Sequence, residues 1–388
     1  MKIFKLGLLI VLCAILLGLI FSSSLLDKEA KGDFIAYWAA ARLLVTGGNP
    51  YDPASLCALE RESHPISLSS GATPGQGLIS WNPPWLLLVL SPFALLPFET
   101  AARLMLFCNL ILIAGAALTT WRHCVGTLTL TGMVLSLLTG LLFVSSLLTL
   151  HIGQVSTLVL ASLFLSLWLL QKRYDGLAGA VLLLTTIKPH LVYFVFLLLG
   201  VWAVSKRRWQ FFGGFVLAGV FSGFIIFLIF PGWPANYLAL VSGHSFSQYS
   251  TSTIGGLVYE LGGGNWARFV GILLLPFVPR FLRLVDTHGW LLTINLALLI
   301  SLPLSPYGFA FDQVVLVPAA VQLVAWVWLG KVKSPWSRFV VAGLIAVYGL
   351  ALWLTILHGV AYHWFAWIPF ALAWLYGMAL NNLQTSFD

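Results

Sequence analysis

The sequence predicts an all-α, polytopic membrane protein, and two observations carry that prediction. The chain of 388 residues is 60% hydrophobic and only 8% charged, whereas a soluble domain has about 25% charged residues. Apolar runs of about 20 residues recur, and each can cross ~30 Å of hydrocarbon as a helix. The alternating segments of a membrane β-barrel are not found in the sequence. We expect one integral domain over 1–388, with 12–14 helical segments.

The first elements follow from the basic residues near the N-terminus. Lys2 and Lys5 place this end in the cytoplasm, since Lys and Arg gather in cytoplasmic loops. Residues 6–26 are expected to form an uncleaved first span, because Ser22–Leu26 is a weak signal-peptidase site. The polar stretch 27–82 is then the first extracytoplasmic loop, which we expect to hold interfacial helices.

The next elements are constrained by the number of membrane crossings, which must leave the basic loops on the cytoplasmic side. Helices are predicted over 83–97 and 104–120, and the basic residues Lys172 and Arg173 must be cytoplasmic. A single span over 127–150 would place them outside. Two half-depth helices, 127–138 and 141–150, remove the conflict and return His151 to the outer side, before a helix over 154–170.

The run 176–205 must also extend towards the outer side and return to the cytoplasmic side, because basic clusters flank both of its ends. Its apex is Lys188-Pro189-His190, where proline permits a break and non-helical backbone lines a cavity. The remaining helices are predicted over 211–230, 267–279, 289–304, 313–330, 338–357 and 364–380. Both termini are then cytoplasmic, in the inner (plasma) membrane.

This threading places most of the polar groups on the outer face, so we predict an outward-facing polar cavity. The residues that reach this face are Asp33, Asp52, Gln76, Asn82, His151, Gln154, Lys188, His190, His244, Glu260, Tyr307 and Asp312. The net charge of +8 is explained by cytoplasmic loops, and a nucleic-acid partner is not expected.

Asp33 precedes an aromatic-rich helical pattern that stops at Gly47-Gly48. One interpretation is that Asp33 is the N-cap of an interfacial helix over 34–46. The other is that its carboxylate, near both lipid and water, accepts a proton from a substrate hydroxyl. The two roles are compatible.

Lys188 lies in an otherwise apolar run, and an ionisable residue at such depth is a functional candidate by default. With His190 beside it, a cation and an imidazole would suit a phosphate, although snorkelling of Lys188 is an alternative. His151 and Gln154 are one helical turn apart and can face one cavity or bond between helices. Asp312 is either a helix cap or a cavity residue, and Asp52, Asn82 and Tyr307 are further cavity candidates.

No metal site and no cofactor are expected. Cys13, Cys57, Cys108 and Cys124 have neither metal-ligand nor disulfide spacing. HExxH, CxxC, Walker and GxSxG motifs are not found in the sequence.

An ordered set of short motifs resembles glycosyltransferase family 87, the polyprenyl-phosphate-mannose-dependent mannosyltransferases of the C-type membrane glycosyltransferase class. The set is GDFIAYWAAA at 32–41, GGNPYD at 47–52, WNPP at 81–84, LSPFALLP at 90–97, GQ at 153–154, KP at 188–189 and SP at 305–306. Each motif is weak alone, and their order makes the set moderately specific.

The resemblance implies an inverting, metal-independent hexosyltransferase, with Asp33 as the general base. The donor would be a polyprenyl-phosphate-linked sugar, with mannose expected, and the acceptor a lipid-linked or envelope glycan. Lys188 and His190 are donor-phosphate candidates, and His151 and Gln154 would line the sugar or phosphate pocket. The family often has a histidine after Ser-Pro in the late outer loop, where this chain has Asp312.

Two rival functions remain open from the sequence. A transporter or flippase of lipid-linked glycans predicts inverted repeats and polar groups at both faces, and we find neither in the sequence. A lipid-to-glycan ligase or polymerase would share the outer cavity but would transfer whole oligosaccharides.

Overall fold

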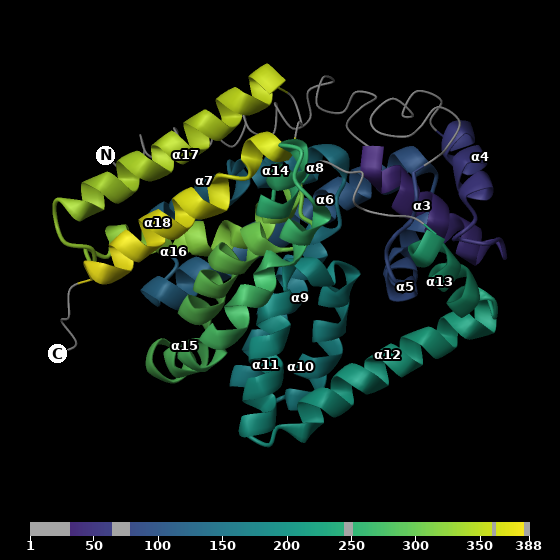
Figure 1. Cartoon of the computed structure of the whole chain (residues 1–388), viewed down its shortest axis with the longest axis horizontal. Helices are drawn as coiled ribbons and strands as arrows, with labels where there is room; N and C mark the ends of the chain where they lie inside the picture. Colours follow the sequence, from purple (N-terminus) through teal and green to yellow (C-terminus); the bar gives the residue numbers. More distant parts are fainter. Residues whose placement is uncertain (1–31, 64–77, 244–250, 359–361, 384–388) are drawn as a thin grey trace. The chain divides into compact units, whose positions relative to one another are not determined.

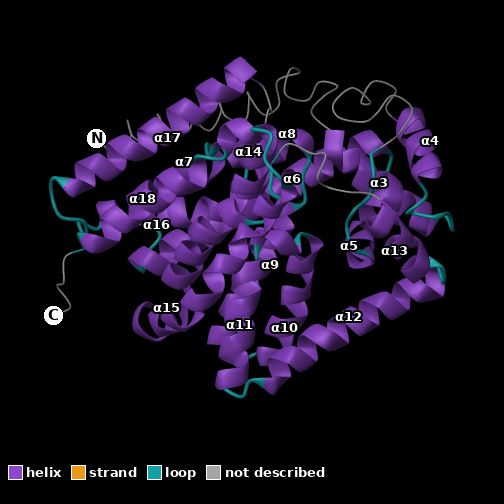
Figure 2. Cartoon of the chain, in the orientation of Figure 1, coloured by secondary structure: helices purple, strands orange, loops and turns teal. Residues whose placement is uncertain are grey.

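The computed structural model describes residues 32–63, 78–243, 251–358 and 362–383. Within these ranges every regular element is a helix, apart from an isolated bridge between Val332 and Leu383 (Figures 1 and 2). The predicted all-α class is confirmed. The predicted first span, 6–26, lies outside the described residues, as do Gln76 and His244.

The described chain forms two compact units, and each is described separately. The first unit contains the described residues up to Asn109, together with 150–155 and 225–240. Its helices are α3 (Gly32–Val45), α4 (Pro53–Ser63), α5 (Pro84–Ala94), the start of α6 (Phe98–Val125) and most of α13 (Trp233–Gly243).

Helix α3 is the centre of the first unit. Ten of its 14 residues are buried, so it is enclosed on most sides and does not show the single apolar face of an interfacial helix. Arg42 donates to the Ala94 carbonyl at 2.8 Å, and Trp38 Nε1 donates to the Leu96 carbonyl at 3.2 Å. These bonds satisfy carbonyls at the C-terminal end of α5, which would otherwise lack partners.

The predicted end of α3 at the glycine pair is confirmed. Gly47 has a φ of +80°, a left-handed conformation that glycine adopts without steric cost. The amide of Gly48 then donates to the Leu43 carbonyl at 2.7 Å, which is the bonding pattern of a glycine-terminated helix.

The second unit contains the described residues of 110–149, 156–224 and from 241 onwards. Its helices are the rest of α6, α7 (Leu130–Leu141), most of α8 (Val144–Ile152), α9 (Ser156–Gln171), α10 (Asp175–Leu182), α11 (Tyr193–Ser205), most of α12 (Trp209–Ile229), α14 (Ile254–Glu260), α15 (Val278–Ser301), α16 (Val317–Trp328), α17 (Trp336–His358) and α18 (Ile368–Asn381). Helices α17 and α18 lie side by side in Figure 1.

Both predicted interruptions of the membrane helices are found. The helices α7 and α8 are bent by 65° at their junction, where the charge parity required two half-depth helices. The run 176–205 breaks into α10, two 3₁₀ turns (Leu183–Ile187 and Pro189–Leu191) and α11. Lys188 stands between the two turns with φ −136° and ψ 72°, because a following proline disfavours the helical conformation.

Other predicted elements differ in length or type. Residues 265–277 form a 3₁₀ helix, and the interval between the predicted helices 267–279 and 289–304 is part of α15, which is kinked at Gly289. Four helices in the described ranges are long and apolar enough to cross a membrane, or five if the bent pair α7–α8 is one span. Several other predicted spans are apolar helices of 10–17 residues, namely 84–94, 156–171, 175–187 and 193–205.

A tight turn between α8 and α9 determines where Gln154 lies. Gly153 has a φ of +68°, and a Cβ there would lie 2.6 Å from Phe34 Cβ of α3. Glycine is thus required both by the backbone conformation and by the close approach of the turn to α3.

We therefore expect Gly153→Ala to lower the stability of the protein by about 2 kcal/mol or more, since the left-handed conformation alone costs about 1–2 kcal/mol for other residues. Gly47→Ala is the matched control, because Gly47 also has a positive φ but has no atom within 4 Å of its Cβ position. The thermal unfolding midpoint in detergent is the measurement. Equal midpoints for the two variants would contradict the importance of the contact with Phe34.

Glu60 is a buried carboxyl group on α4. It is 1% exposed, its Oε2 accepts the Leu78 amide at 3.0 Å, and its Oε1 has no hydrogen-bond partner among the described residues. Burial raises the pKa of Glu60 to about 7, against the lowering effect of the Leu78 bond. The folded protein therefore holds this proton more tightly than the unfolded chain.

Because the folded state binds the extra proton, stability should be greatest below the unfolded pKa of 4.5 and fall as the pH rises towards 7. A pKa difference of one corresponds to about 1.4 kcal/mol, so the largest effect is about 3 kcal/mol. We expect Glu60→Gln to remove most of this decline in a series of unfolding midpoints. Glu62→Gln, an exposed change on the same helix, should leave the decline in place; an identical pH dependence in both variants would disprove the assignment.

Candidate functional site

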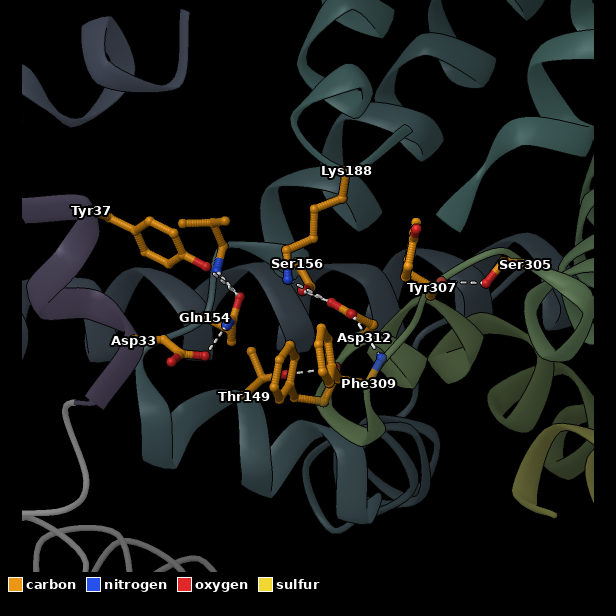
Figure 3. A network of polar contacts seen from close by, with 12 residues as sticks. Asp33, Tyr37, Thr149, Gln154, Ser156, Lys188, Ser305, Tyr307, Phe309 and Asp312 are labelled. Carbon is orange, nitrogen blue, oxygen red and sulfur yellow. Dashed lines mark hydrogen bonds and ion pairs between the residues drawn. The ribbon is translucent and has the colours of Figure 1, made fainter. Parts of the chain in front are cut away.

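Asp33 lies in the first turn of α3 and is half-buried. The helix already includes Gly32, so the predicted N-cap role is replaced by a position within the first turn, where the helix dipole favours a negative charge. Gln154 Nε2 donates a short hydrogen bond to Asp33 Oδ2. Figure 3 shows the two side chains pointing toward one another. A carboxylate near the beginning of the chain is thus bonded by a residue 121 positions later.

The amide of Gln154 is fixed on every side. Its Oε1 accepts from the Tyr37 hydroxyl at 3.0 Å and from the Val155 amide at 3.3 Å. The backbone carbonyl of Gln154 accepts from Asn109 Nδ2 at 3.0 Å. Since the oxygen side has two donors and a carboxylate can only accept, the amide must present its nitrogen to Asp33.

Asn109 was missed by the sequence reasoning. It is a lone amide in the long apolar helix α6 and is fully buried. Its polarity in an apolar run was the available signal, because buried polar groups need hydrogen-bond partners.

His151 and Gln154 are not one turn apart on a single helix, contrary to the prediction. It lies near the end of α8, whereas Gln154 follows the Gly153 turn that separates α8 from α9. Both residues are in the first unit. Gln154 contacts Asp33 directly, and a sugar-contacting role for His151 stays a prediction.

The second unit contains a buried ion pair. Lys188 Nζ donates to Asp312 Oδ1 at 2.7 Å, and the exposed fractions of the two side chains are 9% and 0%. Asp312 Oδ1 also accepts from the Ser156 hydroxyl at 2.6 Å, and Oδ2 accepts from the Phe309 amide at 3.0 Å. Lys188 therefore does not snorkel to solvent, and Asp312 both caps a 3₁₀ helix (Ala310–Leu316) and neutralises a cation.

Lys188 has a further neighbour on the same segment. The Phe311 ring centroid is 4.7 Å from its ammonium nitrogen, a distance suited to a cation–π contact. The Phe311 carbonyl accepts from the Thr149 hydroxyl at 2.9 Å. Figure 3 shows Lys188 and Thr149 near the segment that contains Phe309 and Asp312.

His190 and Tyr307 lie near this ion pair in the fold. Their rings meet edge to face, with centroids 6.4 Å apart, and His190 Nε2 is buried without a hydrogen-bond partner among the described residues. The segment 305–308 is held by Ser305, whose hydroxyl donates to the Tyr307 carbonyl, and by the Ser252 amide, which donates to the Gly308 carbonyl at 2.7 Å. Four predicted candidates, Lys188, His190, Tyr307 and Asp312, therefore come together in the second unit.

Arg268 is a second buried cation of this region that the sequence reasoning did not identify. It is 2% exposed, donates to the Pro306 carbonyl at 3.3 Å and lies over the rings of Tyr259 and Tyr307, at 5.4 and 5.1 Å. Arg268 stands at the outer start of the predicted helix 267–279, where a charge is interpreted as interfacial, so its position gave no signal of a buried site.

Asp52 and Asn82 lie in the first unit. Asp52 Oδ2 accepts from the Ser55 hydroxyl at 2.5 Å and the Ser55 amide at 2.9 Å, which caps α4. These bonds lower the pKa of Asp52, with the hydroxyl bond the largest cause. Asn82 is 5% exposed and precedes the Pro83-Pro84 start of α5, where proline suits a first turn.

Comparisons with known proteins were informative at the level of the family. No curated protein matches the chain. Among solved structures, it is similar to ArnT from Cupriavidus metallidurans bound to undecaprenyl phosphate, with 13% identity and a TM-score of 0.44 over 96% of this chain and 78% of that chain.

The model of glycosyltransferase family 87 matches residues 81–306. The match includes Gln154, Lys188, His190 and Arg268, and it begins after Asp33 and ends before Asp312. It spans more than half of the 388 residues, and the multi-pass pattern of apolar helices agrees with a membrane enzyme. The chain therefore belongs to glycosyltransferase family 87.

Proposed function

We propose that this membrane glycosyltransferase moves a hexose, with mannose the expected sugar, from a polyprenyl-phosphate donor to a glycan or glycolipid acceptor. The observation that carries the proposal is the half-buried Asp33 carboxylate, oriented by the amide of Gln154. The donor class is proposed because a lipid-anchored phosphate would suit a membrane-embedded enzyme with a buried lysine.

Asp33 acts as the general base. The acceptor hydroxyl oxygen attacks the anomeric carbon while Asp33 takes the hydroxyl proton. The bond between the anomeric carbon and the phosphate oxygen breaks, and polyprenyl phosphate leaves with the bonding electron pair. Attack from the opposite face inverts the configuration, so a β-linked donor gives an α-linked product.

Gln154 matches this role because it is a neutral hydrogen-bond donor. A cation in its place would stabilise the ionised carboxylate more strongly and make it a weaker base. A neutral amide instead fixes the carboxylate while leaving it able to accept a proton. A general base must lie within hydrogen-bond reach of the proton that it takes, so a fixed carboxylate suits this role.

Lys188 and His190 are proposed as ligands of the donor phosphate. A preorganised cation near a leaving phosphate stabilises the charge that develops in the transition state, and an imidazole N–H adds a directional bond. The buried Nε2 of His190, which has no hydrogen-bond partner among the residues that the structure describes, is the specific observation that supports a ligand in this region.

The site is proposed to face the extracytoplasmic side of the inner membrane, with both termini in the cytoplasm, because the positive-inside pattern favours that arrangement. A lipid-to-glycan ligase or polymerase would use the same base and is separated from a hexosyltransferase by the size of the transferred glycan. A flippase is disfavoured by the family assignment.

We expect Asp33→Asn to lower the transfer rate by about 10²–10⁴-fold, the contribution typical of a general base, without lowering the unfolding midpoint. Asparagine can still accept the Gln154 bond, so the change removes basicity and keeps the shape. The assay is transfer from polyprenyl-phosphate-mannose to lipid-linked acceptors by the purified protein, with and without a chelator.

The matched control is Asp286→Asn, which removes a carboxylate from an exposed surface pair with Lys206 and should retain the wild-type rate. Full transfer by Asp33→Asn would remove the base assignment. A loss of transfer on chelation would contradict the metal-independent mechanism.

A further inference from the structure

The buried pair of Lys188 and Asp312 has no net charge, which matters for a phosphate ligand. Asp312 is held by three donors, the Lys188 ammonium, the Ser156 hydroxyl and the Phe309 amide. Two of these donors are unrelated to Lys188, so the carboxylate is fixed in place by the fold. Its negative charge remains beside Lys188 when an anion arrives.

The donor and the product differ in charge. A polyprenyl-phospho-sugar is a phosphodiester with one negative charge. Polyprenyl phosphate is a monoester, and monoesters carry about −1.5 to −2 at pH 7 because the second pKa is about 6. A cation that binds the phosphate therefore attracts the product more strongly than the donor, and a lone lysine would favour product inhibition.

We propose that Asp312 competes with the lipid phosphate for the Lys188 ammonium and thereby promotes release of the polyprenyl phosphate product. The inference rests on the proposed function, since it takes Lys188 as a phosphate ligand. Asp312 acts through Lys188 and is a positioning residue, without contact to the reacting atoms.

Electrostatics predicts that Asp312 weakens the binding of the lipid phosphate to Lys188. Coulomb repulsion between two anions falls only with the inverse of their distance and is stronger in a poorly hydrated interior. Asp312 therefore opposes any phosphate on Lys188 and opposes the more highly charged product most. The Phe311 ring, 4.7 Å from the ammonium, helps to retain the cation while Asp312 shares it.

The capping role of Asp312 makes the opposite prediction. Asp312 Oδ2 accepts the Phe309 amide at the start of the 3₁₀ helix 310–316. If the residue were only structural, removing its charge would loosen the segment near Lys188 and weaken phosphate binding. Asparagine keeps an acceptor for the amide while losing the charge, so Asp312→Asn separates the two roles.

The experiment measures the Kd of polyprenyl phosphate, without any sugar, for the detergent-purified full chain. We expect Asp312→Asn to bind it about tenfold more tightly or better, a shift of about 1.4 kcal/mol, and to have a lower kcat and a lower product-inhibition constant. Lys188→Met should bind it more weakly than the wild type. The double variant should bind it more weakly than Asp312→Asn alone, because the tighter binding of that variant requires the Lys188 ammonium.

Two control variants test whether a change in the Kd comes from removing the charge of Asp312. Asp175→Asn also removes the carboxylate of a buried ion pair, with Arg208 at 2.5 Å, and should leave the Kd unchanged. Asp312→Glu retains the charge and should leave Kd near the wild-type value. If asparagine prevents folding, Asp312→Ser removes the same charge with a smaller side chain.

The possible results test the role of Asp312 and the proposed donor separately. An unchanged or higher Kd in folded Asp312→Asn, while the wild type binds and Lys188→Met does not, overturns the role of Asp312 and leaves the proposed donor intact. Absence of polyprenyl phosphate binding by the wild type overturns the proposed donor and this inference with it. Tighter binding together with a slower turnover supports the inference.

Discussion

The hydrogen bond from Gln154 to Asp33 is the contact around which the first unit is arranged. It requires the chain to turn at Gly153, where only glycine allows both the positive φ and the approach to Phe34. Tyr37 then donates to the side-chain oxygen of Gln154, and Asn109 donates to its backbone carbonyl. Because each of these contacts joins residues distant in sequence, the position of one carboxylate depends on the packing of α3, α6 and the α8–α9 turn together.

The main electrostatic feature of the second unit is the buried ammonium group of Lys188. A lysine buried in an apolar run is costly unless it is paired, and Asp312 supplies the partner. The break at Lys188-Pro189 places this cation between two 3₁₀ turns, where the backbone is not helical. Arg268 and the tyrosines beside it hold the neighbouring 305–308 segment. The unit thus keeps cations next to this segment, together with a His190 nitrogen that has no hydrogen-bond partner in the described part of the chain.

Local features were predictable from the sequence, and long-range pairings were not. The end of α3 at Gly47-Gly48 and the break at Lys188-Pro189 follow from the backbone preferences of glycine and proline, and the α7–α8 bend follows from the positions of basic residues. The partners of Asp33 and Lys188 are 121 and 124 residues away, and a single sequence does not encode such pairs in any local pattern. The same limit hid the partners of Asn109 and Arg268, and left Asp312 open between a helix cap and a cavity residue. The one-turn spacing expected between His151 and Gln154 is wrong because the positive φ of Gly153 separates them.

The most direct test of the account is the steady-state kinetics of Gln154→Met, which removes the donor to Asp33 and retains a side chain of similar length. If Gln154 orients the base, kcat should fall by about 10–100-fold, since small displacements of a catalytic group are costly, while the KM for the donor stays near the wild-type value. An unchanged kcat with a raised donor KM would instead make Gln154 a ligand of the sugar or phosphate and contradict its role in positioning Asp33.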